Sequence, residues 1–114
     1  MPSAPERLEF TAAAVPRLAA ELGASCEPAP YRARGEPVYI LHLHSQALRA
    51  SVRLVLWPSL RRVDAYIGDR PPACFIVFKE IADLLVLPGV EVIFRRAGGG
   101  FLLVTSDGQV SCAS

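Results

Sequence analysis

The chain has 114 residues, 52% of them hydrophobic, and a formal net charge of +1. The length is that of one domain, and so small a net charge excludes a global electrostatic field that attracts nucleic acid or anionic lipid. The three cysteines lack CxxC spacing, and no secretory or membrane-spanning pattern is found, which argues against a disulfide framework and a membrane partner. We therefore expect one cytoplasmic domain over residues 1–114, with residues 1–7 as a loose N-terminal tail.

Apolar residues between Thr11 and Leu22 recur at helical spacing, which predicts one amphipathic helix. Pro16 lies inside this stretch, so the helix either begins near Pro16 or is kinked there. Gly23 suits the position just after the end of the helix. Residues 24–37 contain three prolines and are predicted to form a loop.

After residue 37 the hydrophobic period changes to two, which is typical of strands. Strands are predicted over residues 38–45, 49–57, 60–67, 73–78, 90–95, 101–106 and 109–112. A short helix is predicted near residues 79–85. Because most connections are short, we expect an α+β fold: a bent, mainly antiparallel sheet or partly open barrel of about six or seven strands, with one N-terminal helix and one short helix. The predicted core consists of Val15, Leu18, Leu22, Tyr39, Leu41, Leu43, Val52, Leu54, Leu56, Phe75, Val77, Val92, Phe94 and Leu103.

The run from Ala73 to Phe78 is apolar at every position. Successive strand residues point to opposite faces, so such a strand needs cover on both sides. If Phe75 and Val77 face the amphipathic helix, Ile76 and Phe78 need different cover. Ile76 and Phe78 are therefore predicted to lie in an interface. The resulting hypothesis is a non-enzymatic protein–protein interaction module: a homodimer, or a small subunit or assembly factor of a cytoplasmic complex.

Basic and aromatic side chains gather on the second and third predicted strands. Two guanidiniums on one face can hold a carboxylate or a phosphate, and basic grooves with exposed aromatic rings bind single-stranded nucleic acid. A second hypothesis is therefore a nucleic-acid or anionic-ligand binding protein. Asp64 lies close in sequence and would neutralise part of this charge. The candidate residues are Arg53, Arg61, Arg62, Trp57 and Tyr66.

His42 and His44 are separated by one residue on a predicted strand, so their imidazoles project from the same face. Such a pair can supply two ligands to a transition metal ion. A third hypothesis is therefore a small metal-dependent enzyme. The sequence does not select the third metal ligand, for which the candidates are Cys74, Cys112, Glu91 and Asp64. Apart from this metal no cofactor is predicted, and no catalytic residue is assigned.

Overall fold

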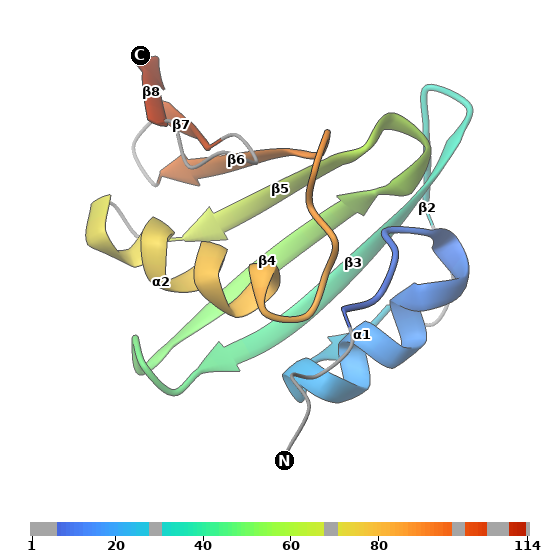
Figure 1. Ribbon diagram of the computed structural model, residues 1–114, viewed down its shortest axis with the longest axis horizontal. Helices are drawn as coiled ribbons and strands as arrows, with labels where there is room; N and C mark the ends of the chain where they lie inside the picture. The colour runs from blue at the N-terminus through green and yellow to red at the C-terminus, as the bar shows by residue number, and fades with distance from the viewer. Residues whose placement is uncertain (1–6, 28–30, 68–70, 97–99, 105–109, 114) are drawn as a thin grey trace.

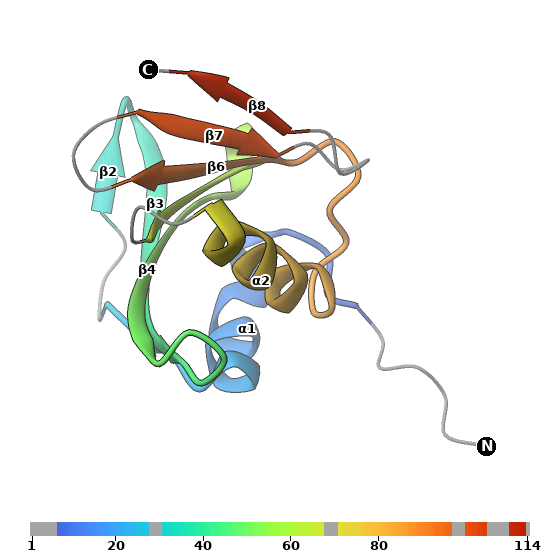
Figure 2. The same ribbon diagram turned by 90° about the vertical axis from the view of Figure 1, so that its left-hand side faces the viewer.

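A curved sheet wraps around two helices in the computed structural model of the protein (Figure 1). The structure describes residues 7–27, 31–67, 71–96, 100–104 and 110–113. Helix α1 comprises Val15–Leu22 and helix α2 comprises Pro71–Ala82. Both lie on the concave side of the sheet, and the opposite side of β3 and β4 carries no helix (Figure 2). This layered arrangement leaves one face of the sheet for contact with something other than the helices.

The strands confirm the predicted class, an α+β fold with a mostly antiparallel sheet that does not close. Along the sheet the order is β1-β3-β4-β5-β6-β7-β8, and β2 pairs with β3 beside β1. Among these neighbours β5 and β6 run parallel, and every other described pair is antiparallel. The bounds are β1 Ser25–Cys26, β2 Tyr31–Ala33, β3 Glu36–Ser45, β4 Ala50–Trp57, β5 Arg62–Ile67, β6 Glu91–Arg96, β7 Phe101–Val104 and β8 Val110–Ala113.

Helix α1 begins at its first turn near Pro16, one of the two arrangements that the sequence allowed. A short 3-10 turn at Ala12–Ala14 leads into it. Gly23 ends the helix at φ 66°, and its N–H bonds to the carbonyl groups of Ala19 and Ala20. A left-handed residue at this position satisfies helix carbonyls that would otherwise lack a donor.

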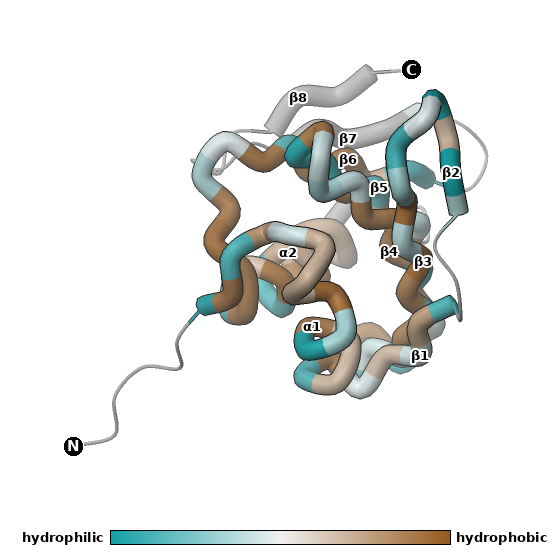
Figure 3. Tube along the Cα trace, turned by 90° about the vertical axis from the view of Figure 1, so that its right-hand side faces the viewer, coloured by the Kyte–Doolittle hydropathy of each residue, from teal (hydrophilic) through white to brown (hydrophobic). Residues whose placement is uncertain are grey.

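The predicted loop at residues 24–37 contains two short strands, β1 and β2. Strand β2 forms a hairpin with β3, and Arg34 and Gly35 at its turn both have positive φ, 55° and 77°. Two successive left-handed residues match the twist of a tight hairpin. The far end of this hairpin is mostly polar (Figure 3). These strands have only two and three residues, so they carry too few positions to show a period in the sequence.

The strand predicted at residues 73–78 is wrong, because these residues lie in α2. Cys74, Val77 and Ile81 are buried at helical spacing, whereas Phe75 is 51% exposed. The proline pair before Ala73 suits the first turn of a helix, where no amide donor is needed. The short helix predicted near residues 79–85 is therefore the second half of a longer helix that ends at Ala82.

This correction removes the expected excess of apolar strand surface, because α2 itself covers the sheet. The buried core combines the inner side of β3, β4, β5 and β6 with both helices. Most of the predicted core is confirmed, with Tyr39 and Leu22 at its margin. Phe75 was predicted in the core because residues 73–78 were assigned to a strand, and it is exposed on α2 instead. The side chain of Leu103 lies outside the described part of the structure.

Candidate functional site

The pleat of the sheet separates the core side chains from a second set that points away from the helices. Leu41, Leu54 and Phe94, for example, lie in the core, so the residues next to them in each strand lie on the opposite side. We call this side the outer face. Its side chains are Ile40, His42 and His44 of β3, Ser51, Arg53, Val55 and Trp57 of β4, Arg62, Asp64 and Tyr66 of β5, and Glu91, Ile93 and Arg95 of β6.

Strand register aligns these side chains in rows across the outer face. One row runs His42, Arg53, Tyr66, Arg95. The next runs Ile40, Val55, Asp64, Ile93. The third contains Trp57, Arg62 and Glu91. Directly opposed residues on neighbouring strands contact each other, so the first and third rows each place an arginine beside an aromatic ring.

Arg62 is held by a carboxylate and by an aromatic ring. Its Nε lies 2.9 Å from Asp64 Oδ1 and its second guanidinium nitrogen lies 3.1 Å from Oδ2, a two-point ion pair. Its Cζ is 5.7 Å from the centroid of the Trp57 ring. Asp64 is only 3% exposed, and Arg95 Nε lies 3.9 Å from its Oδ2. The charge of Arg62 is therefore largely neutralised within the molecule.

Arg53 has the same aromatic support without the carboxylate. Its Cζ lies 4.2 Å from the centroid of the Tyr66 ring, a distance typical of a cation–π contact. Within the described residues its guanidinium makes no hydrogen bond and no ion pair. The side chain is exposed, so its donors face solvent.

Arg61 lies apart from the other two arginines. It follows the 3-10 turn Pro58–Leu60 with φ 50°, and its guanidinium donates a hydrogen bond of 2.7 Å to the carbonyl of Pro88. This contact ties the β4–β5 connection to the segment between α2 and β6. The structure thus brings Arg53, Arg62, Trp57 and Tyr66 together on the outer face and places Arg61 elsewhere.

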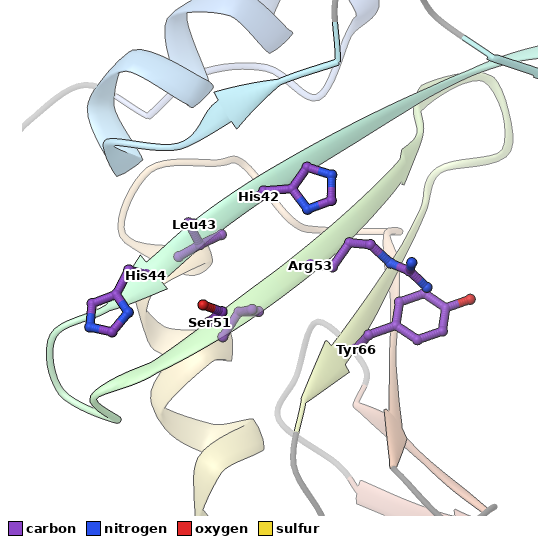
Figure 4. Close-up of a pocket in the computed structure, with 7 residues that line it drawn as sticks. His42, Leu43, His44, Ser51, Arg53 and Tyr66 are labelled. Atoms are coloured by element: carbon purple, nitrogen blue, oxygen red, sulfur yellow. The ribbon is translucent and has the colours of Figure 1, made fainter.

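A shallow depression of about 500 Å³ lies on the outer face beside Arg53. Figure 4 shows His42 and His44 along one strand and Ser51 and Arg53 along the next, with the Arg53 side chain extended over Tyr66. The depression is lined by His42, Leu43, His44, Ser51, Val52, Arg53 and Tyr66. Arg53 brings a positive charge to this lining, and the imidazole and hydroxyl groups can donate hydrogen bonds to the same ligand, so the depression favours an anion over a cation.

The two histidines have different surroundings. His42 Nε2 lies 3.0 Å from Oε1 of Glu27, which follows β1. His44 projects from the outer face near the end of β3, away from His42 (Figure 4). The residues that the structure describes include no group of three or more His, Cys, Asp or Glu side chains arranged to hold a metal ion. Asp64 is engaged by Arg62 and Cys74 is buried in α2, so the metal hypothesis remains a prediction without a third ligand.

Glu27 and Arg95 were missed by the sequence reasoning. Glu27 lies in the proline-rich segment predicted as a loop, where nothing signals that β1 pairs with the centre of β3. Arg95 reaches the outer face because β6 pairs with β5 in parallel. The sequence reasoning expected a mainly antiparallel sheet and a strand at residues 73–78, so it did not predict a helical crossover between β5 and a parallel β6.

Ile76 and Phe78, the predicted interface residues, lie on α2 rather than on a strand. Both are half-buried, and Phe78 packs against the core. Phe75, between Cys74 and Ile76, is the most exposed apolar side chain described on this helix. These residues are on the helical side of the molecule, so they are separate from the outer face.

No described helix has the length and hydropathy needed to cross a membrane. Comparison with models of protein families, with curated proteins and with solved structures finds no match to this chain.

Proposed function

We propose that this chain is a non-enzymatic binding module whose outer face receives an anionic group at Arg53. The contrast between the two arginine–aromatic pairs carries this proposal. Arg62 on Trp57 is paired with Asp64, whereas Arg53 on Tyr66 has its donors directed to solvent beside a depression lined by further donors. An anion bound there would give Arg53 the partner that Arg62 finds within the chain.

Tyr66 makes Arg53 a better binding group than an isolated surface arginine. A free arginine side chain loses rotamer entropy when it is fixed on a ligand, and this loss weakens binding. The ring of Tyr66 limits that loss because it supports the guanidinium 4.2 Å above its centroid before any ligand arrives. Ser51 adds a hydroxyl donor from the same strand.

Titration with malonate, followed by ¹H–¹⁵N NMR, tests the site with a simple dicarboxylate. We expect the Arg53 side-chain signal and the backbone signals of residues 42–44 and 51–53 to shift, and the shifts to weaken as salt is added. Arg53→Ala should lower the apparent affinity about tenfold, because it removes the charge-assisted hydrogen bonds. Arg17→Ala is the matched control, since Arg17 is an exposed arginine on α1. Equal shifts in Arg53→Ala and in the unaltered protein would contradict the proposal.

A second candidate function, self-association through α2, is favoured by the exposure of Phe75. This side chain is 51% exposed and has half-buried Ile76 and Phe78 as neighbours on the helix. Burying a large apolar side chain in a dimer would stabilise it by about 1.5–3 kcal/mol. A homodimer formed in this way would include Ile76 and Phe78, which the sequence assigned to an interface, and Phe75, which it assigned to the core.

Sedimentation equilibrium tests whether the chain self-associates through α2. We expect a reversible dimer whose dissociation constant rises about tenfold or more in Phe75→Ser, since the buried apolar area is lost. Leu60→Ser is the control, because Leu60 is 47% exposed and lies away from α2 on the turn between β4 and β5. A monomer at every accessible protein concentration would contradict self-association.

A further inference from the structure

We infer that the group received at Arg53 is a carboxylate of an acidic protein segment in a partner. This inference rests on the proposed function and names the chemistry of the partner. The first argument is a comparison within the molecule itself. Arg62, backed by Trp57, already holds the carboxylate of Asp64 through two hydrogen bonds of 2.9 and 3.1 Å. Arg53, backed by Tyr66, offers the same planar fork to a carboxylate that comes from outside the chain.

The aromatic rings of the outer face argue against nucleic acid as the partner. Single-stranded nucleic acid binds sheet faces by stacking its bases on exposed aromatic rings. Here Tyr66 already carries the guanidinium of Arg53, and Trp57 carries that of Arg62. A base would have to displace an arginine from its ring before it could stack there.

The charges around Arg53 limit the number of anionic groups that the outer face can accept. Glu27 lies beside His42 at one side of the depression, and Arg62 of β5 and Arg95 of β6 already face Asp64. A phosphodiester chain carries a charge at every nucleotide, so the phosphates on either side of Arg53 would lie near Glu27 or near arginines that are already paired.

A protein segment avoids this repulsion because its charges can be spaced. In an extended segment every second side chain faces the sheet, so one acidic residue can face Arg53 while the next residues on that side are neutral. One carboxylate at Arg53, with uncharged neighbours beside Glu27 and His44, satisfies the charge pattern of the surface. The occupant we infer is therefore an extended segment with isolated Asp or Glu residues.

Fluorescence anisotropy with three labelled probes tests the inference on the intact chain. The probes are a peptide with glutamate at every fourth position among alanine and serine residues, the same peptide with glutamine in place of glutamate, and an oligothymidylate of equal charge. We expect the glutamate peptide to bind at least about tenfold more tightly than the oligothymidylate, and the glutamine peptide not to bind.

Variants then locate the contact. Arg53→Ala should weaken binding of the glutamate peptide about tenfold, and Arg53→Lys should also weaken it severalfold, because lysine keeps the charge and loses the planar fork. Arg17→Ala on α1 should leave the affinity unchanged.

The outcomes separate the inference from the proposed function. Tighter binding of the oligothymidylate, with loss in Arg53→Ala, would overturn the acidic segment and leave anion binding at Arg53 intact. Peptide binding that is unchanged in Arg53→Ala would overturn the inference, because the acidic segment would then lie elsewhere. If no probe, malonate included, binds in a way that depends on Arg53, both proposals are wrong.

Discussion

Replacement of Phe94 by alanine is expected to lower the free energy of unfolding by about 3–5 kcal/mol. Phe94 is fully buried, at 0% exposure, on the inner side of β6. In the register it lies opposite Ala65 of β5, a small residue that cannot fill the space left by a lost ring. The loss therefore combines the transfer free energy of the ring with a cavity in the core. Urea denaturation followed by circular dichroism measures this change.

Phe75→Ala is the matched control for this substitution, since it makes the same chemical change at a side chain that is 51% exposed. We expect a loss below about 1 kcal/mol, because most of that ring already faces solvent. The comparison also tests the helix assignment of the apolar run. Equal losses at Phe75 and Phe94 would show that Phe75 is buried, as a strand at residues 73–78 would require.

Replacement of Arg62 by alanine is expected to destabilise the fold by about 2–3 kcal/mol, because it leaves the Asp64 carboxylate without its main partner. Asp64 is 3% exposed and would keep only Arg95, whose Nε lies 3.9 Å away. The expected loss is below that of a fully enclosed pair, since the Arg62 side chain is 27% exposed and its removal admits water. Urea denaturation measures the loss.

Two comparisons isolate the ion pair. Arg53→Ala removes an arginine that also rests on an aromatic ring but has no carboxylate, and its loss should be below about 1 kcal/mol. The double variant Arg62→Met, Asp64→Leu should be more stable than Arg62→Ala, because it removes the buried charge together with its partner. A double variant less stable than Arg62→Ala would show that Asp64 stabilises the fold independently of Arg62.

The strands that the sequence predicts correctly are those with one buried and one exposed side. In β3 and β4 the inner residues are apolar and most outer residues are polar, so the period of two is visible without coordinates. The run from Ala73 to Phe78 has no such contrast. An apolar stretch of this length fits a buried strand and a buried helix equally well, and the choice depends on the proline pair in front of it.

The candidate site was predictable in part for the same reason. Alternation along β4 and β5 predicts which of Arg53, Arg62 and Tyr66 share a side, once the strand bounds are known. The bounds at the β4–β5 connection were not predictable, because Arg61 adopts the left-handed conformation, which few sequence signals indicate for arginine. Glu27 reaches His42 through a two-residue strand, a tertiary contact that no local pattern encodes.

The parallel pairing of β5 with β6 divides the sheet into two antiparallel parts. Strands β1 to β5 form the larger part, and strands β6 to β8 form the smaller one. The two parts pair along one parallel ladder, from Arg62 opposite Glu91 to Ile67 opposite Arg96. The chain connection between them contains α2. A parallel pair needs a crossover connection, so the attachment of β6 to β8 to the rest of the sheet depends on this helix.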